Sequence, residues 1–124
     1  MKTLKVGISS NAEMKARTLA VARGEHRVAD EPRVWFTSTE SFAKVLSAGN
    51  RELLRIVSEA APGSIEELAQ LTGRAKSNLS RTLKTMAGYG LIRLERGERG
   101  RLAPRIAYDR VELDLAIGAA PKRR

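Results

Sequence analysis

Residues 64–95 constrain the fold most strongly, because two short helical patterns, a turn and a strand pattern follow one another there without interruption. Ser64 and Glu67 have the spacing of a capping box. In that motif the serine oxygen accepts a hydrogen bond from the amide three residues on, and the glutamate reaches back to the cap amide. We therefore expect a helix to begin at Ser64. Its apolar residues recur at the spacing of one buried helical face: Ile65, Leu68 and Ala69.

A second helix is expected over residues 75–88, after a turn in which Gly73 can adopt a positive φ. Its apolar residues lie on one side: Ala75, Leu79, Leu83 and Met86. The opposite side carries Ser77, Arg81 and Lys84, flanked by Lys76, Asn78, Ser80 and Thr85. These residue types can donate hydrogen bonds to base edges and phosphates. Because residues 75–89 include no acidic residue, this helix is suited to lie against negative charge.

A β-hairpin is expected directly after this helix. The apolar period changes from that of a helix to that of a strand, with Ile92 and Leu94 on one face. Residues 97–100 have the composition of a turn, and residues 101–108 are the expected return strand. Pro104 has no amide hydrogen to donate, so we expect this strand to lie at the edge of its sheet.

Residues 77–95, followed by the basic hairpin, resemble the recognition helix and wing of winged helix-turn-helix regulators of the MarR-like kind. The helix-turn-helix and wing part of this resemblance covers residues 50–109. The whole chain also resembles a family of small prokaryotic winged-helix proteins described as transcriptional regulators or antitoxin components. The resemblance implies a homodimer that binds pseudo-palindromic DNA, and it assigns no function to the start of the chain.

The positive charge of the chain is concentrated in the same region. The 124 residues carry a formal net charge of +9. Residues 72–110 hold ten Lys or Arg against three acidic residues, a net charge of +7, whereas residues 51–71 have a net charge of −2. Such clustering favours a surface that binds nucleic acid over a basic surface that only interacts with solvent.

Strand patterns are expected at both ends of the chain. Leu4, Val6 and Ile8 alternate with small or polar residues, as in a half-buried strand. A helix is expected over residues 12–23 and a second strand over residues 33–36, and this order favours a right-handed crossover between parallel strands. Alternation in residues 111–117 predicts a third strand. We expect these strands to form a small sheet that either covers the back of the helices or joins two subunits.

Two further helices are expected between the first sheet strands and residue 64. Thr37 and Glu40 form a second capping-box pattern, which opens a helix with an apolar edge of Phe42, Val45 and Leu46. Gly49 is expected to end this helix, and Asn50 to cap the next one. The apolar face of that next helix comprises Leu53, Leu54, Val57 and Ala61.

Together these patterns predict an α+β fold. It is a winged helix-turn-helix, with a three-helix core and a β-hairpin wing, extended by a small β-α-β element at the N-terminus and by an extra C-terminal strand. The predicted division is residues 1–36 as a sheet or dimerisation element, residues 37–110 as the DNA-binding domain, and residues 111–124 as a strand and a frayed tail.

In a DNA complex, helix 75–88 is expected to occupy the major groove, and wing residues 96–102 to meet the minor groove or the backbone. Arg81 is the first candidate for a bidentate contact to guanine, Asn78 suits adenine, and Ser77 suits either base. The lysines more naturally hold phosphates, and the wing arginines the minor groove. The full set of expected DNA contacts is Arg74, Lys76, Ser77, Asn78, Ser80, Arg81, Lys84, Thr85, Arg96, Arg99 and Arg101.

The sequence offers little for catalysis. Cysteine is absent, which excludes disulfides, thiolate metal sites and a cysteine nucleophile. His26 is the only histidine, and the chain has no phosphate-binding or dinucleotide-binding glycine motif. We expect no enzymatic activity, no metal and no cofactor. No apolar run approaches the length of a membrane helix and residues 1–11 lack a signal-peptide pattern, so we expect a cytoplasmic, nucleoid-associated protein without membrane contact.

The sequence therefore predicts a sequence-specific, double-stranded DNA-binding transcriptional regulator, most simply a repressor. Two alternatives stay open. One is an antitoxin-like module that binds a toxin-like partner protein through its terminal strands and autoregulates through DNA. The other is a chromatin protein that binds DNA without sequence preference.

Overall fold

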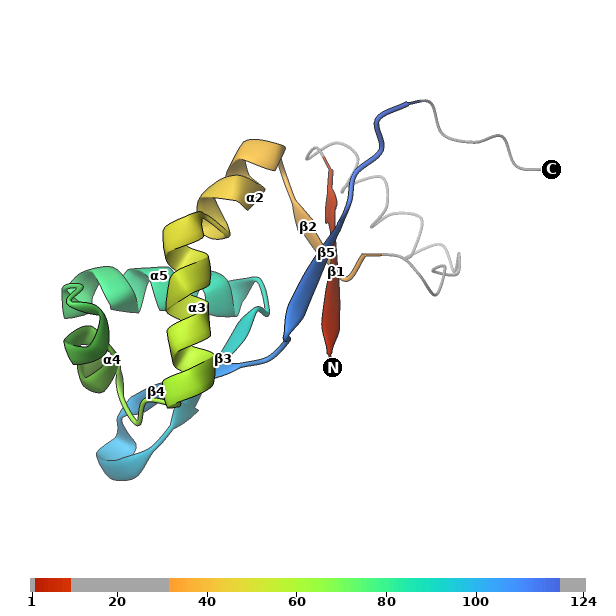
Figure 1. Ribbon diagram of the computed structural model, residues 1–124. Coiled ribbons are helices and arrows are strands. Elements are labelled where there is room, and N and C mark those ends of the chain that lie inside the picture. The colour runs from red at the N-terminus through yellow and green to blue at the C-terminus, as the bar shows by residue number, and fades with distance from the viewer. Residues whose placement is uncertain (1, 10–31, 119–124) are drawn as a thin grey trace.

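The computed structural model describes residues 2–9 and 32–118 of the chain. Within them, four helices, a three-stranded sheet and a two-stranded hairpin form an α+β fold (Figure 1). In chain order the elements are β1 (Thr3–Ile8), β2 (Val34–Phe36), α2 (Thr39–Val45), α3 (Ala48–Ala60), α4 (Ile65–Thr72), α5 (Lys76–Gly88), β3 (Ile92–Arg96), the 3-10 turn η1 (Glu98–Gly100), β4 (Leu102–Ile106) and β5 (Arg110–Asp114).

The three terminal strands form one parallel sheet in the order β2-β1-β5. In its register Val6 lies between Val34 and Leu113. The prediction that the first two strands are parallel neighbours is confirmed. Of the two arrangements left open for the terminal strands, the structure shows the one in which they pair within one chain and pack against its helices. The helix expected over residues 12–23 and His26 lie outside the described residues.

One face of this sheet packs against the helices. Leu4 and Val6 of β1 and Phe36 of β2 are at most 1% exposed. The Phe36 ring stacks on Tyr89 at the end of α5, with ring centroids 4.1 Å apart, and meets Phe42 of α2 edge-on at 5.3 Å. The sheet and the helices therefore share one hydrophobic core.

Serine hydroxyls cap the first three described helices, and two of these caps differ from the predicted ones. Ser38, not Thr37, caps α2 by accepting a hydrogen bond from the amide of Ser41 at 3.0 Å. Ser47 caps α3 by accepting from the amide of Asn50 at 3.2 Å, so Gly49 and Asn50 lie inside the first turn of α3. In both cases a serine next to the predicted cap has the extended backbone that a cap requires.

The connection from α3 through α4 to α5 follows the predicted turns. Ser64 accepts from the amide of Glu67 at 3.1 Å, while the Glu67 carboxylate accepts from Gly63, one residue before the expected cap amide. Gly73 ends α4 with φ +74°. Ala75 is the exposed N-cap of α5 and does not belong to its apolar face. Similarly, Ala61 is an exposed left-handed cap and lies outside the apolar face of α3.

The hairpin and the last strand are shorter than predicted. β3 and β4 pair antiparallel with Leu94 opposite Pro104, and both strands of this two-stranded sheet are edges, as Pro104 requires. β4 covers residues 102–106 of the expected 101–108. β5 ends at Asp114, so Leu115 and Ile117 lie beyond the strand and are 43% and 97% exposed.

We expect Leu83→Ala to lower the free energy of unfolding by about 2–5 kcal/mol, because it removes a fully buried side chain and leaves a cavity. Leu71→Ala is the matched control. It shortens a helical leucine that is 51% exposed and should cost less than about 1 kcal/mol. Urea unfolding followed by circular dichroism measures both values, and equal losses would contradict the position of the core.

Candidate nucleic-acid interface

The surface of α5 opposite the core carries the central predicted contacts. Leu79, Leu83 and Met86 are fully buried, while Ser77, Arg81 and Lys84 are exposed one to two turns apart on the other side. The helical period therefore places these three side chains in one row along α5, as the sequence predicted. We call this row the α5 face.

The flanking residues of α5 differ in their freedom to make new contacts. Lys76, Asn78 and Thr85 are exposed, and Ser80 is half-buried at the margin of the core. The Thr85 hydroxyl donates to the carbonyl of Arg81 at 3.1 Å, so it already has a partner within its own helix. Asn78 thus extends the α5 face more directly than Ser80 or Thr85, whereas Lys76 is exposed but paired with Glu66 of α4.

A single carboxylate of α4 connects this helix to the hairpin. Glu66 Oε1 lies 2.8 Å from Lys76 Nζ, and Glu66 Oε2 lies 3.4 Å from an Nη of Arg101. The hydrogen bond from Lys76, followed by the charges of Lys76 and Arg101, lowers the pKa of Glu66 below its ordinary value. Two predicted DNA contacts that are distant in the chain therefore meet at one acidic residue.

The hairpin tip presents the remaining predicted arginines. Arg96, Arg99 and Arg101 are all exposed. Arg99 has φ +59°, and an Nη of Arg96 lies 3.4 Å from the carbonyl oxygen of Gly100, a geometry that orders the turn. Arg99 and Arg101 also line a shallow hollow beside the start of α4. The wing arginines thus lie on the α4 side of the molecule, next to the Glu66 contacts.

Arg74 is directed toward α3 and away from the α5 face. One Nη donates to the carbonyl of Gly49 at 3.0 Å, and the other lies 3.4 Å from Asn50 Oδ1. Asn50 in turn donates its side-chain amide to the carbonyl of Val45. In this arrangement the guanidinium fastens the turn before α5 to the start of α3, so Arg74 positions the helix.

Sequence reasoning missed two residues that organise this surface. Glu66 lies in the first turn of α4, where the helix dipole favours an acidic residue whatever its other contacts, so its position in the sequence indicates no partner. Arg105 donates to the carbonyl of Pro62 at 2.8 Å and so ties β4 to the connection between α3 and α4. The partners of both residues are distant in the sequence, and no local pattern could have indicated them.

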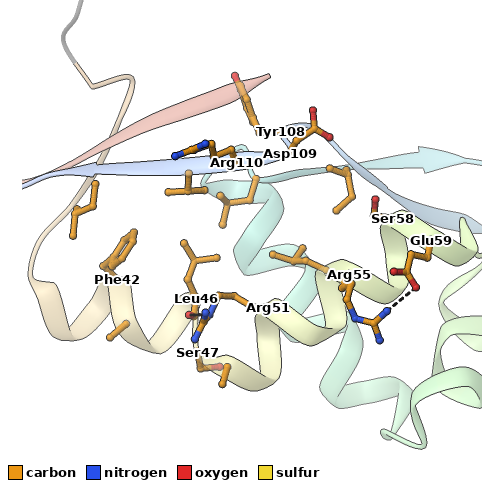
Figure 2. Close-up of a pocket in the computed structure, with 17 residues that line it drawn as sticks. Phe42, Leu46, Ser47, Arg51, Arg55, Ser58, Glu59, Tyr108, Asp109 and Arg110 are labelled. Carbon is orange, nitrogen blue, oxygen red and sulfur yellow. Dashed lines mark hydrogen bonds and ion pairs between the residues drawn. The ribbon is translucent and has the colours of Figure 1, made fainter. Parts of the chain in front are cut away.

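A second feature, on another part of the surface, is an open groove of about 900 Å³ between α2, α3 and β5 (Figure 2). Its lining includes Leu46, Leu54, Val111 and Leu113. At its margin Arg55 is paired with Glu52 and Glu59, as Figure 2 shows for Glu59, and the hydrogen bond from Arg55 lowers the pKa of Glu52. The groove is therefore an apolar surface with a charged rim.

Residues 2–9 and 32–118 contain no group of three or more His, Asp or Glu side chains placed to hold a metal ion. None of the helices in this part of the chain is long and apolar enough to cross a membrane.

The described residues thus define a small α+β protein with one acid-free, cationic helix face. The chain belongs to the HVO_A0114 family, which it matches over residues 45–113. This match includes α3, α4, α5, the hairpin and most of β5, and it leaves out β1 and β2. No curated protein and no solved structure matches the chain.

We expect the Glu66 carboxyl to titrate at a lower pH than an ordinary glutamate. Because its pKa is lowered in the folded protein, its ion pairs are present at neutral pH and are lost as the pH falls through that lowered pKa. NMR titration of the side-chain carboxyl measures this pKa. Lys76→Gln should raise it more than Arg101→Gln does, since the Lys76 hydrogen bond is the largest cause.

Lys84→Gln is the control for that titration, because it removes a lysine of α5 that has no ion pair with Glu66. A Glu66 pKa that shifts equally in the Lys76 and Lys84 variants would show that net charge, and not the contact, is responsible.

Proposed function

We propose that this protein is a winged helix-turn-helix regulator that binds double-stranded DNA with sequence preference and acts on transcription, most simply as a repressor. The observation that carries the proposal is the α5 face, an exposed row of hydrogen-bond donors on a helix without an acidic residue. In this proposal the protein acts by binding alone, without catalysis or a cofactor, in the cytoplasm.

The arrangement of elements is compatible with this fold. In the proposal α3, α4 and α5 are the three-helix core, α5 is the recognition helix, and the β3–β4 hairpin is the wing. Two contacts support a fixed relation between wing and helices: Glu66 bridges Lys76 and Arg101, and Arg105 is bonded to the Pro62 carbonyl. A wing held in this way can meet DNA next to a helix in the major groove.

The proposed roles follow from side-chain chemistry and exposure. Arg81 makes a bidentate contact to guanine and Asn78 a contact to adenine, while Lys84 holds a phosphate. Arg99 at the hairpin tip enters the minor groove or meets the backbone. Because Arg74 is engaged with α3, we assign it the positioning of α5 and no direct contact.

A second candidate function has its own support. The apolar groove and the exposed Leu113, Leu115 and Ile117 offer a surface for another protein, as an antitoxin-like module would need. Such a module would use the α5 face for autoregulation. Co-purification with the product of a neighbouring gene, at fixed stoichiometry, separates this function from that of an autonomous regulator.

Fluorescence anisotropy tests the main proposal. The protein is titrated into DNA from upstream of its own gene and into a shuffled duplex of equal composition, over a range of salt concentrations. We expect a preference of about a thousandfold or more for the specific site. Equal affinities that fall together with salt would favour the chromatin protein, and absence of binding to either duplex would favour the protein-binding module.

We expect Arg81→Ala to weaken binding to the specific duplex by about 1–3 kcal/mol, or about 5- to 150-fold, and to relax discrimination at one base pair. Lys84→Ala should weaken binding to both duplexes alike and reduce the salt dependence by about one charge. Arg55→Ala removes a guanidinium from α3 that is already paired, and should change neither affinity. Equal losses on both duplexes for Arg81→Ala would contradict its assigned role.

We expect Glu66→Gln to strengthen binding to both duplexes, because it releases Lys76 and Arg101 for phosphates. The plot of log affinity against log salt should steepen by up to about two charges. Glu59→Gln is the control. It removes the same single negative charge, but from α3, where the carboxylate pairs with Arg55 and not with Lys76 or Arg101. Similar steepening in the two variants would assign the effect to net charge.

A further inference from the structure

β5 is an outer strand of the parallel sheet. β1 occupies one of its edges, and no strand among residues 2–9 and 32–118 pairs with the other edge. Arg110, Glu112, Leu113 and Asp114 are exposed. An exposed edge strand presents unpaired backbone groups that can pair with another strand.

The direction of the backbone groups in β5 follows from the ladder. Ser9 donates its amide to the Phe36 carbonyl at 2.8 Å, and Arg33 donates to the Lys5 carbonyl at 3.0 Å, so the odd-numbered residues of β1 bond toward β2. The even-numbered residues of β1 then bond toward β5, and Leu4 lies opposite Val111. Consequently Val111 and Leu113 direct their own N–H and C=O groups to the open edge.

The same two residues carry apolar side chains toward the groove. Val111 and Leu113 both line it, Leu113 is 39% exposed, and Leu115 just beyond the strand is 43% exposed. Figure 2 shows the groove between β5 and the helices α2 and α3. The open edge and the apolar surface therefore adjoin one another, as they do where a strand is added to a sheet beside a hydrophobic pocket.

The charges of β5 make this strand complementary to itself. In an antiparallel pair centred on Glu112, all five strand residues find a partner: each Arg110 faces the partner's Asp114, and each Val111 faces the partner's Leu113. This register therefore makes two attractive Arg110–Asp114 pairs and only one repulsive pair, between the two Glu112 carboxylates. A pair centred on Leu113 would instead set Glu112 against Asp114 twice, and a pair centred on Val111 would leave Leu113 outside the paired strands.

We propose that a second copy of this chain adds its β5 antiparallel to β5, in the register centred on Glu112, and joins the two sheets into one of six strands. The interface is isologous, with the same residues on both sides of a two-fold axis. This register carries the partner's Leu115 past Asp109, along the wall of the groove. The proposal goes beyond DNA binding and requires no DNA.

Single-cysteine variants test the register directly, since the chain has no cysteine. In the proposed pair the two residues at position 112 form a non-hydrogen-bonded pair with Cα atoms about 4.5 Å apart, within the range of a disulfide. Glu112→Cys should give a covalent dimer on mild oxidation, without DNA. Asp114→Cys is the matched control: its two copies lie about four residues apart along the strands, roughly 13 Å, and should not crosslink.

Reversing the charges at positions 110 and 114 gives a second test, in which sedimentation equilibrium measures the dissociation constant of the dimer. The unaltered chain should be a dimer, and Arg110→Asp should raise the dissociation constant at least about tenfold, because two ion pairs become repulsive contacts. Adding Asp114→Arg to this variant should restore the dimer, since the pairs re-form with reversed polarity.

A chain that is monomeric at about 100 µM would overturn the proposal. So would a dimer that crosslinks in the Asp114→Cys variant and not in the Glu112→Cys variant. Binding of a different protein in place of a second copy would also overturn it. All of these results are obtained without DNA, whereas the proposed function is tested by binding to duplexes, so failure of the interface and failure of the proposed function are distinguishable.

Discussion

The stacking of Phe36 on Tyr89 connects the two parts of this molecule. Phe36 comes from β2, and Tyr89 follows the last turn of α5, so one ring pair joins the terminal sheet to the helix that carries the α5 face. A three-stranded sheet this small gains much of its stability from packing against other elements. By burying the apolar face of the sheet here, the chain also holds the C-terminal end of α5.

At the other end of α5 the connection is electrostatic. Lys76, Arg101 and Glu66 bring α5, the hairpin and α4 together at exposed positions. Exposed ion pairs contribute little to stability, so the Glu66 bridge matters for the direction of two cations more than for the strength of the fold. In the proposed function, phosphates compete with Glu66 for these cations, which links the orientation of the wing to the occupancy of the DNA surface.

Local physics explains which features could be predicted from the sequence. Leu79, Leu83 and Met86 are buried because the helical period groups them on one side, and the exposed position of Arg81 follows from the same period. Gly73 adopts the positive φ expected at the end of a helix. The predicted N-caps of α2 and α3 were wrong, by one residue and by three residues respectively. Several polar residues compete there, and the direction in which the chain enters the helix selects one of them.

The sequence by itself determined the type and order of the described helices and strands, the main buried residues of α3, α4 and α5, and the accumulation of positive charge from residue 72 onward. These properties depend on neighbours within one or two turns, or on composition. Only the tertiary structure decided that β1 lies between β2 and β5, that Arg74 is hydrogen-bonded to Gly49 of α3, and that Glu66 forms ion pairs with Lys76 and Arg101. Each of these contacts joins residues far apart in the chain, and their partners are selected by the packing of the shared core, which no local period encodes.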